Sequence, residues 1–247
     1  MQTEMQDLLT AAFQSQMNNV YTAIPCVVVS VDGPGTVSIQ PAINQKMKDG
    51  TVKERPVLRG VPISFPVSKK AGFTFPVSAG DTGVAVFSMR SMETWKSGDG
   101  YPSTPNNFAK MDKSDAMFIP GIQTPSTSVN SPSKHILEHS PQDAVMFNGL
   151  GSNEAEVRIK QNGDVLIRTQ QKVIVECDEA HVTANTSASI TTPTLSIDAQ
   201  NTTWIGDCTW TGNVAHNGTF TFNGIPFATH KHVGVTSGVQ TSGTPVP

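Results

Sequence analysis

The tripeptide His230-Lys231-His232 has the residue types and spacing of a candidate metal site. In an extended chain, residues i and i+2 point to the same face, so both imidazoles can converge on one point while Lys231 points away. A single pair near a chain end is most often exposed and without a ligand. Three pairs around a threefold axis, however, would supply six nitrogens, which suit an octahedral ion such as Fe(II), Ni or Co better than tetrahedral zinc. The pair therefore predicts a metal site only if the rest of the chain favours a trimer.

The other candidates for chemistry are weaker. His135 and His139 are spaced i, i+4 but stand among prolines, so we expect a loop there and no helical metal pair. His181 and His216 occur singly, and packing is the ordinary role of such residues. No nucleophile, zinc-protease or phosphate-loop motif occurs, and nothing positions two carboxylates for glycoside hydrolysis, so we predict no catalytic residue. The carboxylates considered for such a pair are Glu154, Glu156, Asp164, Glu176, Asp178 and Glu179.

The composition limits the class of protein. The chain has 247 residues, a formal charge of -3 and only 15% charged residues. With 37% hydrophobic residues, it fits neither a highly charged disordered chain nor a membrane protein. The 20 glycines and 17 prolines favour short strands and turns over helices. The small negative charge gives no electrostatic basis for binding nucleic acid.

The N-terminus and the cysteines bear on where the protein is made. The first residues include Glu4 and Asp7 and no basic segment, so we expect no signal peptide and synthesis in the cytoplasm. Cys26, Cys177 and Cys208 are odd in number and widely spaced. This pattern favours buried or half-buried thiols over a disulfide framework or a zinc site.

Residues 1–22 are expected to form one amphipathic helix. Apolar residues recur there at spacings of three and four, and Pro25 prevents much continuation beyond it. Two interpretations remain open, because terminal helices commonly do either: packing on the helix's own domain, or docking to a partner. The apolar residues of the pattern are Met5, Leu8, Leu9, Ala12, Phe13, Met17 and Val20.

Residues 23–97 are expected to form a small barrel of the OB-fold type. About five short apolar strands follow one another, separated by turns such as Asp32-Gly33-Pro34-Gly35. The prolines of this segment fall at strand ends or edges, where they are tolerated. The expected strands are residues 26–31, 36–41, 57–65, 73–77 and 84–87.

Residues 98–149 are rich in turn residues and are expected to connect two units, with one short buried stretch at Met117-Phe118-Ile119. In residues 150–228, short alternating strands recur about every eight residues, first at Val157, Val165 and Val173. A strand and a turn repeated at this interval indicate a stacked β architecture.

This repeat segment has one sparse apolar face and no helix to cover it. A lone sheet of this kind would expose that face and its strand edges, whereas three chains around one axis would cover both. A single-chain solenoid is the alternative, but its coils normally need about 20 residues or more. The predicted fold is mainly β: an N-terminal OB-fold barrel, then an intertwined homotrimeric triple-stranded β-helix or β-prism. Residues 229–247 would form its metal-bound apex, with His230 and His232 as ligands.

Three sections together resemble the membrane-piercing central spikes of contractile-tailed bacteriophages, in particular the Mu-like baseplate spike family. The first section extends from Gly60 to Trp95 and includes Gly80-Asp81-Thr82-Gly83, and it is similar to the N-terminal OB domain of those spikes. The second is the repeat region after Gly149. The third is His230-Lys231-His232 with the Gly-, Ser- and Thr-rich residues that follow.

The resemblance implies a homotrimer at the tail baseplate tip of the virion. Its OB domains would attach to tail hub and baseplate proteins, and its β-helix would project toward the host. One iron ion per trimer would lie on the threefold axis, held by His230 and His232 of each chain. Six protein ligands leave no open position for water, so the metal would be structural. The implied role is to puncture the host outer membrane during tail contraction and genome delivery, without catalysis and without binding nucleic acid.

Two alternatives are kept. One is a trimeric β-helical tailspike enzyme that degrades surface polysaccharide, which would need a cleft with paired carboxylates. The other is the spike tip of a related contractile secretion system.

Overall fold

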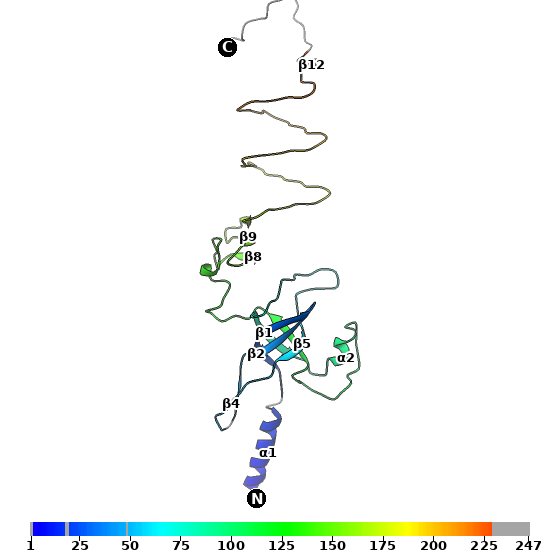
Figure 1. The fold of residues 1–247 in the computed structure, drawn as a ribbon, viewed down its shortest axis with the longest axis vertical. Helices are drawn as coiled ribbons and strands as arrows, with labels where there is room; N and C mark the ends of the chain where they lie inside the picture. The colour runs from blue at the N-terminus through cyan, green and yellow to red at the C-terminus, as the bar shows by residue number, and fades with distance from the viewer. Residues whose placement is uncertain (1, 18–19, 48, 229–247) are drawn as a thin grey trace, which may run out of the picture. The chain divides into compact units, whose positions relative to one another are not determined.

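The computed structural model describes residues 2–17, 20–47 and 49–228. The protein is mainly β, and it divides into two compact units, Met1–Glu176 and Cys177–Pro247 (Figure 1). The units are described separately below. Among the helices of the described residues, none combines the length and the apolar character needed to cross a bilayer.

Five strands of the first unit form one curled half-barrel sheet in the order β5-β2-β1-β6-β7. All neighbours in it are antiparallel. β1 and β2 are joined by a tight turn in which Gly35 adopts a φ of 76°, a conformation that favours glycine. The strands are β1 (Ala23–Gly33), β2 (Thr36–Pro41), β5 (Leu58–Pro62), β6 (Thr82–Phe87) and β7 (Ala116–Pro120).

The core lies on the concave face of this sheet, where alternate side chains of each strand meet. Phe118 on β7 is the largest fully buried side chain. Its ring lies against Gly83 on β6, where any Cβ atom would collide with it, so the close approach of the two strands requires glycine there. Cys26 is part of the same core, and burial raises the pKa of its thiol to about 11. This cysteine is therefore a packing residue with little thiolate character.

The predicted strands at 26–31, 36–41, 57–65 and 84–87 are confirmed as β1, β2, β5 and β6. The strand predicted at 73–77 is wrong. Phe73 and Phe75 instead lie in irregular chain. The ring of Phe75 packs between those of Phe73 and Phe65, with ring centroids 5.9 Å from Phe73 and 5.2 Å from Phe65. β7 falls within the residues expected to form the connector, and it completes the sheet by pairing with β6.

A second sheet of the first unit has the order β10-β9-β8 and is antiparallel throughout. The segment of residues 129–143 covers one of its faces, as the contacts below show. Its strands are β8 (Ala144–Asn148), β9 (Ala155–Ile159) and β10 (Val165–Thr169).

The remaining elements of the first unit are short, apart from the N-terminal helix. They are α1 (Gln2–Met17), β3 (Gln45–Lys46), β4 (Val52–Lys53), α2 (Glu93–Lys96) and the 3-10 helix η1 (Pro132–Lys134).

The second unit is built differently. Figure 1 shows its described part as a single chain that runs back and forth in extended passes. Among residues 177–228, the only paired strands are the two-residue strands β11 (Thr221–Phe222) and β12 (Ile225–Pro226), which pair with each other. The other passes have no strand partner in the described chain.

Candidate functional site

The predicted metal ligands His230 and His232 lie outside the described residues, as does the rest of the predicted apex. The described residues contain no group of three or more histidine, cysteine, aspartate or glutamate side chains arranged to hold a metal. The metal site therefore stays a prediction. The described surface that stands out is apolar, and it begins on the β8–β10 sheet.

The outer face of the β8–β10 sheet is apolar and largely exposed, although its central row lines a hollow shared with Phe73 and Phe75. Met146, Val157 and Ile167 form one row across the three strands, because Met146 pairs with Val157 and Val157 with Ile167. Ile159 and Val165 form a second row beside it. These five side chains are between 37% and 67% exposed. A sheet normally turns its apolar face toward a core, so this sheet carries its apolar face on the wrong side for an isolated chain.

The inner face of the same sheet carries charged side chains beside the half-buried apolar residues Val145, Phe147 and Leu166. Glu156 and Arg158 alternate with the apolar residues of β9 and are 3% and 2% exposed. Arg158 contacts Glu156 at 2.9 Å and Asp143 at 3.5 Å, and Arg168 on β10 contacts Glu156 at 2.6 Å. Both arginines also donate to the carbonyl oxygen of Glu138, which ties residues 129–143 to the sheet. The covered inner face therefore holds an ion-pair network, whereas the apolar side chains of the outer face stay largely exposed.

His135 completes this buried network. Its Nδ1 contacts Glu154, its Nε2 lies 2.8 Å from the carbonyl oxygen of Val129, and the side chains of His135 and Glu154 are fully buried. The backbone N–H groups of Ile136 and Leu137 donate to the other oxygen of Glu154, at 2.7 Å and 3.2 Å. Both ring nitrogens of His135 therefore lie against oxygen atoms of the loop and of the start of β9. The pair thus holds the loop onto the start of β9.

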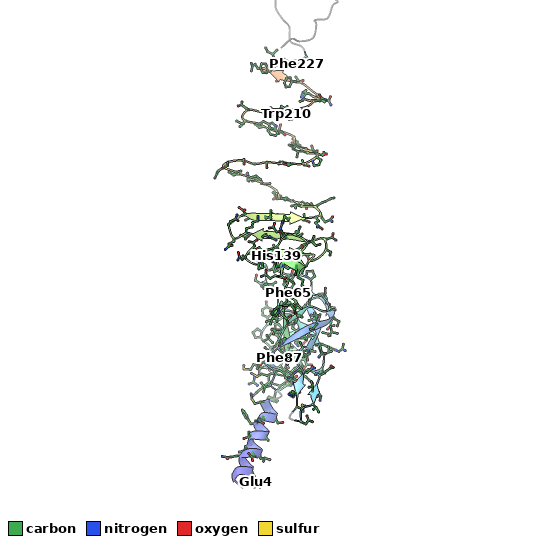
Figure 2. All side chains as sticks on the ribbon, turned by 90° about the vertical axis from the view of Figure 1, so that its left-hand side faces the viewer. Glu4, Phe65, Phe87, His139, Trp210 and Phe227 are labelled. Carbon is green, nitrogen blue, oxygen red and sulfur yellow. The ribbon has the colours of Figure 1, made fainter. Side chains whose placement is uncertain are left out.

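His139 stacks on His135, with ring centroids 3.8 Å apart (Figure 2 labels His139). Its Nε2 lies 3.0 Å from Asn130 Oδ1, and its buried Nδ1 has no hydrogen-bond partner. Burial, together with the positive charges of His135 and Arg158, lowers the pKa of His139 below its ordinary value of 6.5. The two histidines weighed as a metal pair are therefore brought together, but as parts of a buried polar network.

Burial alone would raise the pKa of Glu154, but the hydrogen bonds from His135, Leu137 and Ile136 outweigh it and lower the pKa below the ordinary 4.5. The lowered pKa values of His139 and Glu154 both make the folded protein less stable as the pH falls. The contribution of His139 is complete above pH 6.5 and is lost as the pH falls below that value, and the contribution of Glu154 is lost at still lower pH.

Acid is therefore expected to loosen residues 129–143. After correction for intrinsic exchange rates, the amide protons of Ile136 and Leu137 should lose protection from hydrogen exchange as the pH falls from 7.5 to 5. His139→Gln, which cannot titrate, should flatten this dependence. Amides of the half-barrel core, such as that of Phe118, serve as the internal control. Equal loss of protection at Phe118 and in the loop would contradict a local effect.

The second unit, considered by itself, also exposes apolar side chains. Every described pass there carries at least one large apolar side chain, and all of these are more than half exposed. Figure 2 shows them, Trp210 among them, on single passes of chain. Cys177 and Cys208 are exposed for the same reason, which corrects the expectation of buried thiols. The large apolar side chains of the passes are Val182, Ile190, Leu195, Ile197, Trp204, Ile205, Trp210, Val214, Phe220 and Phe222.

The repeat length of these passes is at first close to the predicted interval of about eight residues and then becomes shorter. Bends fall at residues 178, 185–186, 193 and 200, seven or eight residues apart, and then at 206, 212 and 218, six residues apart. The later bends coincide with Gly206, Gly212 and Gly218, whose φ values of 114°, 117° and 122° favour glycine. The spacing from Val157 to Val165 has another origin, since both lie in the antiparallel β9–β10 pair.

The carboxylates weighed for hydrolysis are also placed. Glu154 and Glu156 are buried and engaged by the contacts above. His181 contacts Glu179 at 3.4 Å, with both side chains exposed, and His216 packs edge-on to Phe220. Asp164, Glu176, Asp178 and Glu179 are exposed.

The geometry of the half-barrel sheet can now be compared with known families. Residues 24–121 match the family model described as the phage protein Gp138 N-terminal domain. The match begins at the second residue of β1 and ends one residue after β7, so it covers the half-barrel sheet from its first strand to its last. It supports a phage structural protein and a place in the virion. It spans less than half of the chain, and a comparison with curated proteins gives no match.

Proposed function

We propose that this chain forms the central spike of the tail baseplate in a contractile-tailed phage, and that the spike punctures the host outer membrane during contraction. The observation that carries the proposal is the row of extended passes with exposed apolar side chains and no strand partner in the described chain. Such passes are stable only if other chains cover them. The phage family match of the half-barrel sheet supports the same setting.

The covering chains are further copies of this protein, arranged as a homotrimer with an intertwined β-helix. Each pass offers two open edges for hydrogen bonding, and copies that wind together would fill both with identical passes. The bends, seven or eight and then six residues apart, give every copy the same advance along the chain. Three copies, as the resemblance to phage spikes implies, would also bring three histidine pairs to one axis.

In this proposal the barrel, as the OB-fold domain, attaches to tail hub and baseplate proteins, and the opposite end meets the host outer membrane. The spike acts mechanically and is not an enzyme. Antibodies raised against the half-barrel sheet should label the baseplate tip of intact tails in electron micrographs. Labelling of the capsid or of the tail sheath, or cleavage of host surface polysaccharide by the purified protein, would count against this function.

The proposed apex holds one iron ion through His230 and His232 of the three chains. Exchanging both histidines for alanine is expected to remove the metal and leave the trimer intact, because the passes bury far more apolar area than the apex can. Elemental analysis together with the solution mass of the purified variant checks both parts.

The matched control for the apex is Lys231→Ala, which should keep the metal because Lys231 would point away from the axis. Metal retained in the double-alanine variant, or three metal ions per trimer in the unaltered protein, would overturn the six-histidine site.

A further inference from the structure

Helix α1 is the longest helix of the described residues, and its own unit does not cover it. Every described side chain from residue 4 to residue 17 is exposed. Its large apolar residues Met5, Leu8, Leu9, Phe13 and Met17 are between 52% and 68% exposed. Its own unit therefore leaves these apolar side chains exposed, which favours the second interpretation of this helix, docking to a partner. Five large apolar side chains on one short helix require a partner surface.

The apolar residues of α1 follow the spacing of a coiled-coil seam. Met5, Leu9, Ala12 and Gln16 succeed one another at intervals of four, three and four residues. Leu8 and Phe13 flank the seam, which broadens the apolar stripe. A stripe wider than two seam positions suits a bundle of three helices better than a pair, because each helix then meets two neighbours.

The opposite side of α1 is polar and already has a neighbour. Ala11, Gln14, Ser15 and Met17 line a hollow shared with Asp49 and with Gln45, Lys46 and Met47, of which the first two form β3. Gln14 lies about 140° around the helix from Leu9, at roughly 100° per residue. The acidic residues of the helix, Glu4 and Asp7, occupy no seam position. Copies of α1 can therefore meet along the seam without bringing like charges together.

We propose that the α1 helices of three copies associate, parallel and in register, into a short coiled coil that closes the N-terminal end of the assembly. This inference rests on the proposed homotrimer. The copies are parallel because each α1 precedes the same barrel in its own chain. The seam then forms three-helix layers of Met5, Leu9 and Ala12, with Gln16 as a polar layer at the end nearer the barrel.

The coiled coil depends on the rest of the chain. A helix of 16 residues is only about 24 Å long, and isolated helices of this length are marginal in water. Three helices joined to one assembly are present at an effective concentration near the millimolar range, which favours a contact too weak to form between free helices. The passes of the second unit would supply that assembly.

The test places cysteine in the seam of the full-length chain. Cys177→Ser and Cys208→Ser first remove the two exposed native thiols, and Cys26 stays because it is buried. Leu9→Cys in this background should form a disulfide between copies on mild oxidation, visible as a dimer band on a non-reducing gel. At most two chains in three can be cross-linked, because a trimer leaves one thiol over. Gln14→Cys, on the far side of the helix, is the matched control and should not cross-link.

The solution mass of each variant separates the possible failures. A trimer in which Leu9→Cys does not cross-link, or in which Gln14→Cys cross-links as readily, overturns the coiled coil and leaves the spike proposal standing. A monomer for the background that carries only Cys177→Ser and Cys208→Ser overturns the homotrimer itself. Met5→Cys, at the neighbouring seam position, is a second cross-linking test and should form the same dimer band as Leu9→Cys.

Discussion

Ile167→Asp is expected to convert the assembled protein into monomers. Ile167 is 61% exposed and ends the apolar row that it forms with Val157 and Met146 across the outer face of the β8–β10 sheet. If copies cover that row, three aspartates would be brought together in an apolar environment. The cost of burying an unpaired carboxylate is several kcal/mol for each chain, which exceeds what a modest interface can offset. Light scattering coupled to gel filtration measures the outcome.

The control for this change is Ser152→Asp, which adds the same charge in the exposed turn between β8 and β9. It should leave the mass unchanged. An Ile167→Asp protein that keeps the mass of the unaltered assembly would show that copies do not meet on this face.

Glu156→Gln is expected to have the largest effect on the stability of a single chain. Glu156 is 3% exposed and holds two arginines, Arg158 at 2.9 Å and Arg168 at 2.6 Å. Removing its charge leaves Asp143, at 3.5 Å, as the only ionic partner of the buried Arg158 guanidinium among the described residues. Breaking a buried pair in this way costs about 3–5 kcal/mol. The free energy of local opening, measured by hydrogen exchange in β8–β10, should fall by an amount of this order.

Glu179→Gln is the matched control. Glu179 also has an ionic partner, His181 at 3.4 Å, but both side chains are exposed. Exposed pairs of this kind contribute about 0–1 kcal/mol, so hydrogen exchange should hardly change. Equal effects of the two substitutions would show that the network under the sheet does not hold it together.

The half-barrel sheet could largely be predicted from the sequence, because its strands alternate apolar and polar residues between clear turns. β7 was harder to place. Its five residues follow a long polar stretch, and only its pairing with β6 shows that it belongs to the sheet. The failed strand at 73–77 has the aromatic residues of a strand, but they pack with Phe65 instead of forming a ladder.

The orientation of the β8–β10 sheet, with its charged face covered and its apolar face exposed, could not be predicted for a different reason. Charged residues alternate with apolar residues along positions 154–159, and the sequence shows this alternation directly. Alternation alone does not tell which face of the sheet is covered. The apolar face is the one that a sheet usually packs against a core. Here His135 and residues 129–143 cover the charged face, a contact between segments that no local pattern indicates.

The sequence predicted the apolar positions of the passes, but it did not predict that the interval between passes shortens along the second unit. The interval of about eight rests on Val157, Val165, Val173, Val182 and Ile190, of which the first two belong to a paired hairpin. The passes advance by seven or eight residues and then by six. Glycine at every sixth position from Gly206 to Gly224 was the available signal, because each of these residues adopts a positive φ.

The central claim is that the exposed passes and the outer sheet face are covered by two further copies of the chain. The solution mass of the purified full-length protein, determined by light scattering or sedimentation equilibrium, tests it most directly. The account predicts a mass of about three times the 26.3 kDa of one chain. A stable, folded species of 26.3 kDa would contradict it.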